Sequence, residues 1–341
     1  MKVAIIFDGL SALGKTPDVA ILGSVEAVEA ALVEGGHEPV RVPVNPDGRW
    51  VERLRKLRAD LVFNLCEGID GLGSYEPAVV GALELLGLPY TGASAWTTAL
   101  CLRKHVVNAH LQAHGLPVPR FAVARRGGPL PTVGFPSICK PAAEDASLGV
   151  EQRSVVRTRG QLEARVAEMH QRWDEVLVQR YIDGREVNVG VVGDQVLPIA
   201  EIDFGRMPRG KWRIVTYRSK WEDGCDEDVG AVPAVPAELG EPLALELERV
   251  AREAWRLVGG DGYGRCDFRI DRMGRPWLLE VNANPDISPH AGLARMARAA
   301  GMDYAGLVRA VCEHATSKAN TLPADRWALT QRLSGVAGQR A

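Results

Sequence analysis

The chain has 341 residues, of which 46% are hydrophobic, and its 41 Lys and Arg residues nearly balance 43 Asp and Glu residues to leave a formal net charge of -2. This composition is typical of a globular protein with two or three domains, and the near-neutral charge argues against a protein that binds nucleic acid by bulk electrostatic attraction. No stretch approaches the roughly 18 uninterrupted apolar residues of a membrane span.

The cysteines and the start of the chain indicate the compartment. The six cysteines lie far apart and form no CxxC pair, which is typical of buried or incidental thiols in a reducing compartment. The apolar run at residues 3–7 is too short for a secretory signal peptide. We therefore expect a cytoplasmic enzyme or binding protein without a nucleic-acid or membrane partner.

The N-terminal part alternates between strand and helix patterns. The apolar run at 3–7 predicts a buried parallel strand, and apolar residues at helical spacing follow it until Gly35–Gly36. Further strands are expected at 40–43 and 61–65, with a charged helix at 50–58 between them. This alternation predicts a parallel α/β layer, and the segment after the first strand lacks the G-x-G-x-x-G spacing of a dinucleotide site.

The sequence pattern changes near Pro117, where short strands separated by Gly and Asp turns predict an α+β module. These strands are expected at 121–123, 137–140, 175–180, 187–192 and 196–202. Residues 206–228 are rich in Gly, Arg, Lys, Trp and Asp and predict a long mobile loop, a type of segment that is usually functional. An amphipathic helix is expected over 243–257, ended by Gly259–Gly260, and a polar tail from about Thr321.

Two segments near the C-terminal end alternate with period two and bring two acidic residues together. Residues 265–271 and 277–282 flank a Met273–Gly274 turn and predict a β-hairpin. A turn centred there places Asp267 directly opposite Glu280. The other face of the hairpin would then carry the apolar side chains of Cys266, Phe268, Leu279 and Val281.

Carboxylates directly opposite one another repel unless a positive group lies between them. Arg265 and Arg269 share that face and could neutralise the pair. The alternative is a divalent-cation site with oxygen ligands from Asp267, Glu280 and Asn282, which lies one pleat along the same face. Such ligands, without a nearby His or Cys pair, suit Mg²⁺ or Mn²⁺ rather than Zn²⁺. Because Mg²⁺ usually completes its coordination shell with substrate phosphates, this alternative predicts a nucleotide.

Residues 264–267, taken with 279–285, resemble the C-terminal signature of ATP-grasp enzymes. The chain is most similar to the D-alanine–D-alanine ligase branch of carboxylate–amine ligases, from Met1 to about residue 316. Further matches in the family order are residues 62–64, 85–92, Lys104, 115–119, 136–141 and 184–186. The resemblance implies an α/β (α+β) ATP-grasp fold in which two α+β subdomains enclose ATP. It implies an N-terminal α/β substrate domain at 1–95, a central subdomain at 96–185, a C-terminal subdomain with the metal site at 186–318, and a tail at 319–341.

The resemblance also implies roles for individual residues. In the family pattern, three lysines hold the ATP phosphates, a hinge segment reads adenine, an acid binds the ribose and a glycine-containing loop covers the phosphates. The lysines at the matching positions are Lys104, Lys140 and Lys220. The hinge segment is Gln179 to Ile182, which includes Tyr181, and the ribose acid is Glu186. The phosphate loop is 142–149, with Ser147 and Gly149. That loop is poorer in glycine and more acidic here than is usual in the family. Considered without the family motif, each lysine is typical of a protein surface. Considered in the same way, Glu186 is typical of a surface salt bridge near Arg185.

The implied reaction has two steps. A substrate carboxylate attacks the γ-phosphate of ATP to form an acyl phosphate and ADP, and an amine then displaces phosphate to leave an amide. Metal ions and lysines neutralise the transferring phosphoryl group, and Arg265 is placed to stabilise the oxyanion of the tetrahedral intermediate. An ion pair between Arg265 and Asp267 is compatible with that role.

Departures from the family pattern cluster at the positions that would contact substrates. The stretch Ser11–Gly14 lacks the expected acid, Ala146 replaces a serine, Trp221 replaces a tyrosine, and Glu67 stands where a histidine is usual. The ATP and metal positions persist, which predicts ligase chemistry on a carboxylate and an amine other than two D-alanines. The candidate substrate contacts are Glu67, Asp286, Ser288 and His290. Glu67 is equally typical of a loop carboxylate, and His290 of a structural residue behind the substrate.

Three alternatives follow from these patterns. The leading one is an ATP-dependent ligase that forms a peptide or other amide bond between small molecules. The second is a D-alanine–D-alanine ligase with atypical substrate residues, and the third is an ATP-binding regulatory protein without turnover. Related ligases often dimerise, so the resemblance also implies a homodimer. No residue pattern in the sequence establishes one.

Overall fold

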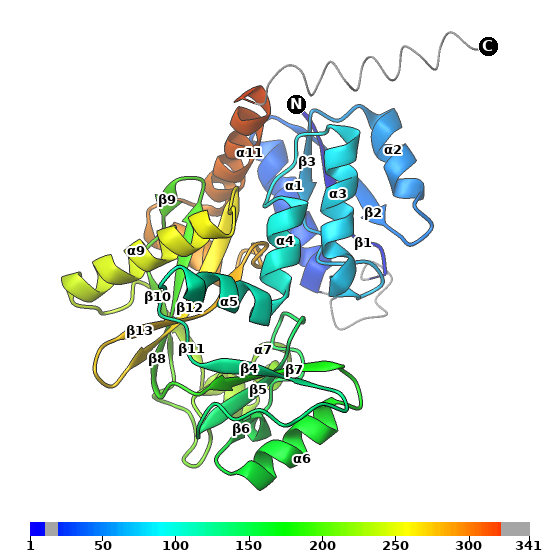
Figure 1. Ribbon diagram of the computed structural model, residues 1–341. Helices are drawn as coiled ribbons and strands as arrows, with labels where there is room; N and C mark the ends of the chain where they lie inside the picture. The colour runs from blue at the N-terminus through cyan, green and yellow to red at the C-terminus, as the bar shows by residue number, and fades with distance from the viewer. Residues whose placement is uncertain (11–19, 322–341) are drawn as a thin grey trace. The chain divides into compact units, whose positions relative to one another are not determined.

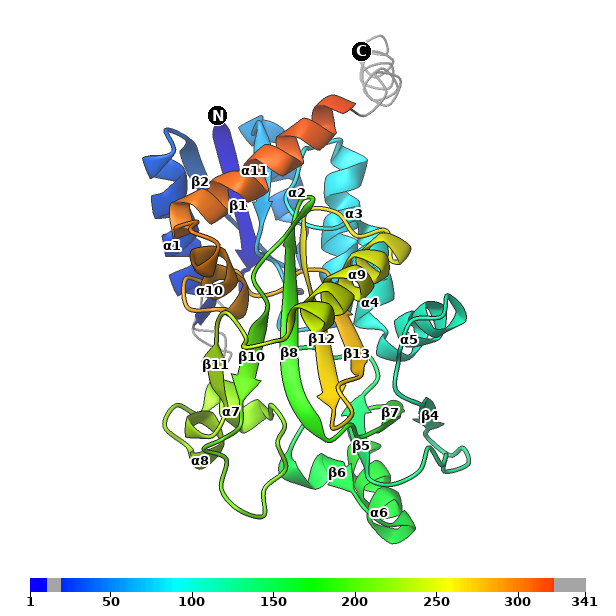
Figure 2. The same cartoon turned by 90° about the vertical axis from the view of Figure 1, so that its left-hand side faces the viewer.

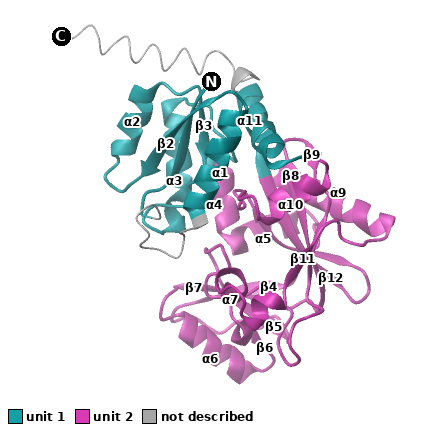
Figure 3. Cartoon of the chain, turned by 180° about the vertical axis from the view of Figure 1, so that it is seen from behind, with its two compact units in different colours: residues 1–95, 261–263, 302–341 teal, residues 96–260, 264–301 magenta. Residues whose placement is uncertain are grey.

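A computed structural model describes residues 1–10 and 20–321, and the chain divides into two compact units (Figure 1, Figure 3). Unit 1 comprises residues 1–95, 261–263 and those from 302 onwards, and unit 2 comprises residues 96–260 and 264–301. The tail predicted from about Thr321 lies outside the described residues from position 322 on. Within the described ranges, no helix is long and apolar enough to cross a bilayer.

Unit 1 is built on a parallel sheet, as the strand–helix alternation predicts. Strand β1 (Lys2–Asp8) lies between β2 (Glu38–Val44) and β3 (Leu61–Asn64), and both neighbours run parallel to it. Ile5 and Ile6 point to opposite faces of β1 and both are fully buried, so both faces of the strand are covered. The helices of this unit are α1 (Ala20–Glu34), α2 (Arg49–Leu57), η2 (Gly73–Tyr75), α3 (Glu76–Leu86) and α11 (Tyr304–Thr321).

Unit 2 contains a four-stranded antiparallel sheet in the order β4 (Phe121–Arg125), β7 (Glu175–Arg180), β5 (Ser137–Pro141), β6 (Val155–Val156). One face packs against α6 (Arg159–Met169), because Cys139 and Val178 join Leu162 and Met169 in a single apolar cluster. Side chains alternate along a strand, so Lys140 lies on the opposite face, the one away from α6. The elements α5 (Lys104–Ala113) and η3 (Gln152–Ser154) contact this sheet, and α4 (Ala95–Leu102) precedes α5 in the chain.

The second sheet of unit 2 has the order β11 (Val232–Ala234), β10 (Ala200–Asp203), β8 (Gly184–Val192), β12 (Tyr263–Asp271), β13 (Pro276–Asn282), with β9 (Gln195–Val196) paired to β8. The single strand predicted at 196–202 is wrong. It is two strands, because Pro198 has no N–H to continue a ladder and β9 turns back onto β8.

Helix α9 (Glu241–Leu257) covers the apolar face of this second sheet (Figure 2). Trp255 lies so close to β12 that a Cβ atom on Gly264 would meet its ring at 2.4 Å. The sheet is also contacted through Gly190 by α10 (Gly292–Ala299). Since the α9 side of β12 holds Gly264, Cys266 and Phe268, the odd-numbered polar residues of β12 face the other way.

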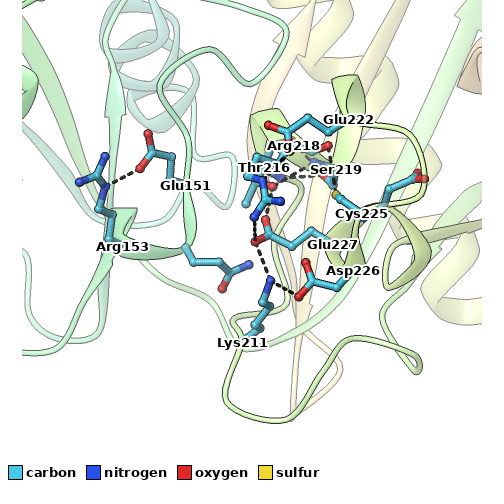
Figure 4. A network of polar contacts seen from close by, with 12 residues as sticks. Glu151, Arg153, Lys211, Thr216, Arg218, Ser219, Glu222, Cys225, Asp226 and Glu227 are labelled. Carbon is cyan, nitrogen blue, oxygen red and sulfur yellow. Dashed lines mark hydrogen bonds and ion pairs between the residues drawn. The ribbon is translucent and has the colours of Figure 1, made fainter.

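The segment at 206–228, predicted as a long loop, contains two short helices, α7 (Tyr217–Trp221) and α8 (Asp226–Val229). Its polar centre is Glu227, which is 3% exposed and accepts hydrogen bonds from Lys211 Nζ at 2.9 Å and from Thr216 Oγ1 (Figure 4). The segment is tied to η3 by Gln152, whose side chain bonds both the N–H and the carbonyl of Trp212. We call residues 206–228 the covering segment.

Candidate functional site

The β12–β13 hairpin has the register that the sequence predicts at its functional end. Asp267 pairs directly with Glu280, and Cys266 with Val281. The register then shifts between Asp267 and Phe268, so that Phe268 pairs with Leu278. The prediction that Leu279 belongs to the buried apolar face is therefore wrong: the bulge inserts an extra residue, and Leu278 is fully buried while Leu279 is half-buried.

Asp271 holds the turn of this hairpin. Its carboxylate accepts bonds from the backbone N–H groups of Met273 and Arg275, from Arg275 Nε at 2.8 Å and from Trp277 Nε1 at 3.0 Å. Burial alone would raise the pKa of Asp271, but these donors together lower it to about 2. The turn is thus fixed by an ionised side chain, and with it the position of the acidic pair.

The carboxylate of Asp267 is 6% exposed and is surrounded by donors. Arg265 binds it through Nε at 2.7 Å and its terminal nitrogen at 2.9 Å, while the amides of Asn188 and Asn282 donate at 2.7 and 3.0 Å. Four bonds use all the lone-pair positions of a carboxylate. Neutralisation by Arg265, one of the two sequence interpretations, is therefore present, whereas Arg269 does not contact this pair and binds Glu186 instead.

Glu280 lies among the cations that the sequence predicts for phosphate binding. Lys104 Nζ is 3.8 Å from Glu280 Oε2. Burial would raise the pKa of Glu280, but the charges of Lys104, Lys140, Arg265 and Lys220 hold it well below its usual range. The structure therefore gathers these four predicted cations around one predicted metal ligand.

The predicted metal ligands supply oxygen atoms of the type that Mg²⁺ prefers. Asn282 touches Asp267 through its amide, and Glu280 is the cross-strand neighbour of Asp267, so the three side chains are adjacent. Among the described residues no three His, Cys, Asp or Glu side chains are grouped as metal ligands. The donor set thus fits a hard cation held by two carboxylates and an amide, and such an ion would share Asp267 with Arg265 or displace one of its amide donors.

The loop 142–149 lies beside these cations. Lys104 is 6% exposed and its ammonium donates to Asp145 Oδ1 at 2.6 Å and to the Glu144 carbonyl. Ser147 has a left-handed backbone with φ of 60°, as has Gly149 with φ of 72°. Trp221 of the covering segment donates its Nε1–H to the Ala146 carbonyl at 3.2 Å. Ala146 and Trp221, where the family resemblance leads us to expect a serine and a tyrosine, therefore contact each other through an indole and a main-chain oxygen.

The segment predicted to read adenine begins at the end of β7. Gln179 is 1% exposed, and its Nε2 has no hydrogen-bond partner among the described residues. Tyr181 is buried in an apolar cluster with Ile138 and Ile214, and its N–H donates to the Pro136 carbonyl. Ile182, the next residue, is half-buried. A buried donor without an acceptor is the kind of feature that a heterocyclic base could satisfy.

Glu186 is held by Arg269, which the sequence pattern placed beside the acidic pair and not beside Glu186. Arg269, 3% exposed, lies 2.7 Å from Glu186 Oε2, donates to the carbonyls of Gly184 and Arg213, and stacks over Tyr181 at 5.5 Å. The alternative of a salt bridge between Glu186 and Arg185 is wrong, because Arg185 binds Glu201. Asn188, which donates to Asp267, was missed. Period-two alternation could have found it, since Asn188 follows Glu186 at spacing two.

Comparison with known proteins identifies the family. The protein-family model described as "D-ala D-ala ligase C-terminus" matches residues 111–313. A D-alanine–D-alanine ligase of Citrifermentans bemidjiense is 32% identical over 318 residues, which cover 93% of this chain and 97% of that protein. The chain belongs to the D-alanine–D-alanine ligase family. It is an ATP-grasp ligase that binds ATP and forms carbon–nitrogen bonds, so the predicted family, fold class and enzyme class are confirmed.

Other relatives of this ligase differ in what is known of them. A D-alanine–D-alanine ligase of Chromohalobacter salexigens is 32% identical, covering 92% of this chain and 94% of that protein. An uncharacterised protein of Sinorhizobium fredii is 31% identical over 300 residues. The structure of a D-alanine–D-alanine ligase from Bacillus anthracis complexed with ATP aligns with a TM-score of 0.77 at 20% identity, covering 94% of this chain and 99% of that one. This last likeness shows the shared ATP-grasp fold.

The candidate substrate residues of the ligase are divided between the two units. Asp286 is exposed and accepts bonds from the N–H and hydroxyl of Ser288. Burial alone would lower the pKa of the Arg265 guanidinium, but the negative charges of Asp267 and, to a smaller extent, Asp286 raise it. His290 is exposed in the same unit. Glu67 is exposed in unit 1. The Ser11–Gly14 stretch, where the family acid is missing, lies outside the described residues.

Proposed function

We propose that this ligase joins a small carboxylate to an amine through an acyl phosphate, with ADP and phosphate as the other products, and that its substrates are not two D-alanines. The observation that carries the proposal is the cluster of Lys104, Lys140, Lys220 and Arg265 around Glu280. Such a concentration of positive charge beside buried carboxylates suits a triphosphate with its metal ion.

In this proposal the nucleotide is bound by three groups of residues. Lys104, Lys140 and Lys220 hold the phosphates, with Ser147 in the loop above them. Gln179, Tyr181 and Ile182 hold the base, and the buried Gln179 Nε2 supplies a donor for it. Glu186, fixed by Arg269, accepts bonds from the ribose hydroxyls.

We assign Asp267, Glu280 and Asn282 to a Mg²⁺ or Mn²⁺ ion. When bound, the ion neutralises charge on the transferring phosphoryl group. The residues of the chain prepare this site beforehand, since the lysines and Arg265 keep Glu280 ionised, and Asn188 and Arg265 fix the orientation of the Asp267 carboxylate.

The bond changes follow from this arrangement. A carboxylate oxygen of the acid attacks the γ-phosphorus of ATP, and the bond from that phosphorus to the β-γ bridging oxygen breaks to release ADP. The amine attacks the acyl carbon, the oxyanion is stabilised by Arg265, and phosphate leaves with the former carboxylate oxygen. Asp267 holds the Arg265 guanidinium in place through two bonds. The covering segment excludes water, which would otherwise hydrolyse the acyl phosphate.

The proposal that the substrates are not two D-alanines is supported by Ala146 and Trp221, which replace a serine and a tyrosine of the family pattern. Their contact uses a main-chain oxygen and an indole, so neither of these two positions offers a side-chain hydroxyl. We assign substrate contacts to Glu67, Asp286, Ser288 and His290. The curated relatives named D-alanine–D-alanine ligase favour the second candidate, a ligase that accepts D-alanine. All six cysteines are free thiols, which together with the use of ATP supports a cytoplasmic enzyme.

The test is release of ADP and phosphate from Mg²⁺-ATP by the purified full chain, screened with pairs of D- and L-amino acids, dipeptides and simple amines. We expect one pair to stimulate release, with a product lighter by one water than the sum of its substrates. D-Alanine alone should stimulate far less. Stimulation by D-alanine as strong as by any other pair would establish the second candidate instead.

A further inference from the structure

Lys104, to which we assign the ATP phosphates, already has an anionic partner within the chain. Its ammonium donates to Asp145 Oδ1 at 2.6 Å and to the Glu144 carbonyl, and lies 3.8 Å from Glu280. An ammonium has three donors. Two of them bond Asp145 and the Glu144 carbonyl, and Glu280 lies beyond hydrogen-bond distance. A phosphate oxygen that binds Lys104 therefore competes with these partners for the ammonium.

The backbone around Asp145 is built to make this contact. The N–H of Lys104 at the start of α5 donates to the Ala142 carbonyl, which brings the lysine to the beginning of the loop. Glu144, the residue before Asp145, is anchored by Trp173 Nε1 at 2.9 Å. The residue after it, Ala146, is left-handed with φ of 54°, a conformation that costs energy in a residue with a Cβ atom. The loop therefore presents Asp145 to the lysine from a fixed base.

Asp145 is the displaceable partner of the three. Its side chain is 47% exposed, whereas that of Glu280 is 23% exposed and Lys104 itself is almost buried. The Glu144 carbonyl is fixed with the anchored backbone. An exposed carboxylate can turn into water at little cost, because solvent replaces its partner.

The charge balance of the site also changes with Asp145. The carboxylates that oppose the four cations around Glu280 include those of Asp145, Asp267 and Glu280 itself. Asp267 and Glu280 are the assigned metal ligands, so their charge is used when a metal–nucleotide complex binds. The charge of Asp145 is not used in this way and repels the phosphates of the nucleotide.

We infer that Asp145 is an internal competitor of ATP: its carboxylate occupies the place on Lys104 that a phosphate oxygen takes, so nucleotide binding displaces the Asp145 side chain from the lysine. The inference rests on the proposed function, because it uses the assignment of Lys104 to the phosphates. It makes Asp145 a residue that sets the affinity for nucleotide. The displaced carboxylate is then repelled by the phosphates, so the Asp145 side chain holds a second conformation when ATP is bound.

The experiment measures binding by calorimetry for the full chain, with Mg²⁺ and either a non-hydrolysable ATP analogue or adenosine. The variant is Asp145→Asn, which keeps the shape of the side chain and removes its charge. The control is Asp174→Asn, which removes one charge from the same sheet region at an exposed residue paired with Arg126. We expect Asp145→Asn to bind the analogue more tightly by on the order of tenfold, with adenosine affinity unchanged and the control like the wild type.

A second comparison tests whether the effect acts through the lysine. In a Lys104→Gln background, Asp145→Asn should give a clearly smaller gain in affinity for the analogue, because the competing ion pair is already absent and only repulsion of the phosphates is relieved. The same gain in both backgrounds would overturn the competitor inference in favour of general charge repulsion. An unchanged or weaker affinity in the single variant Asp145→Asn would overturn it as well, weaker binding meaning that the carboxylate assists the metal–nucleotide complex.

These outcomes separate the inference from the function on which it rests. If the wild type binds the analogue and Asp145→Asn makes no difference, the competitor is disproved and the ligase proposal stands. If neither the wild type nor the variants bind the analogue, the assigned nucleotide site is wrong and the inference falls with it.

Discussion

Glu280 lies directly opposite Asp267 on the β12–β13 hairpin, and the register shifts by one residue immediately beyond Asp267. A one-residue shift exchanges the two faces of a strand. The bulge therefore separates a polar end of the hairpin, where the acidic pair faces the cations, from a turn end where Leu278 replaces Leu279 in the core. Bulges of this kind are common beside functional sites because they re-aim side chains.

Replacement of the central carboxylate should stop phosphoryl transfer. In Glu280→Gln the four surrounding cations lose one of the anions that balance them, and the assigned metal ion loses a ligand. We expect kcat for ADP release to fall by at least about a hundredfold. Glu246→Gln, which removes an acid paired with Arg249 on the exposed surface of α9, is the control and should keep full activity. Unaltered kcat in Glu280→Gln would disprove the metal assignment.

The turn residue Asp271 should make stability depend on acid. Its pKa in the folded chain is about 2, below the ordinary value of 3.8. A lowered pKa means that Asp271 contributes its full stabilisation above about pH 4 and loses it as the pH falls towards 2. At pH 7, Asp271→Asn should lower the free energy of unfolding by about 1–3 kcal/mol. The difference from wild type should shrink steadily below pH 4, as followed by denaturant unfolding monitored by circular dichroism.

Asp194→Asn, at the exposed turn between β8 and β9, is the control for this prediction and should leave stability unchanged at every pH. A difference between Asp271→Asn and wild type that stays constant from pH 7 to pH 2 would argue that the side chain acts by shape and not by charge.

Arg269 should matter for both stability and nucleotide affinity. Arg269→Met leaves Glu186 half-buried without its cation and removes donors to two carbonyls. We expect the free energy of unfolding to fall by about 3 kcal/mol, because one member of a buried ion pair is removed. The KM for ATP should rise, since Glu186 is no longer oriented.

The matched control for Arg269 is Arg272→Met at the turn of the same hairpin. That side chain is 84% exposed and paired with Asp183. The change should alter stability by less than about 0.5 kcal/mol. Equal losses of stability in the two variants would show that the buried contacts of Arg269 stabilise the fold no more than the exposed pair of Arg272 does.

The covering segment should open when its buried acid is neutralised. Glu227→Gln weakens the bonds to Lys211 and Thr216 that hold the segment together (Figure 4). Tryptic cleavage within residues 206–228 should accelerate by on the order of tenfold, because it follows the population of the locally open form. Asp226→Asn, which contacts the same lysine from an exposed position, should have a much smaller effect. A bound ATP analogue should slow cleavage in all three proteins, and identical rates in both variants would contradict a special role for Glu227.

The parts of the molecule that follow from periodicity could be predicted from the sequence. The apolar run at β1 and the alternation around Asp267 and Glu280 determine which faces are buried, because burial of one face selects the register. The gathering of Lys104, Lys140 and Lys220 came from the family resemblance alone, since three lysines scattered along a chain carry no pattern. The split of the strand predicted at 196–202 was foreseeable, because Pro198 lacks the N–H that a ladder requires.

Other features depend on contacts between distant segments and could not be predicted. The bulge beyond Asp267 leaves no mark on the period-two pattern of either strand. The contact between Asp145 and Lys104 requires the left-handed backbone of Ala146 and the anchor of Glu144 on Trp173, which lie far from α5 in the sequence. The helices of the covering segment form around buried Glu227, whose burial no local pattern indicates.

The most direct test of the central claim follows an oxygen atom. An acid substrate found by the screen is labelled with ¹⁸O in both carboxylate oxygens, and the released phosphate is analysed by mass spectrometry after a single round of ligation. Our account predicts one ¹⁸O atom in each phosphate and one in each amide, because the phosphate leaves with the oxygen that attacked ATP. Phosphate without label, formed alongside the amide, would contradict the acyl-phosphate mechanism.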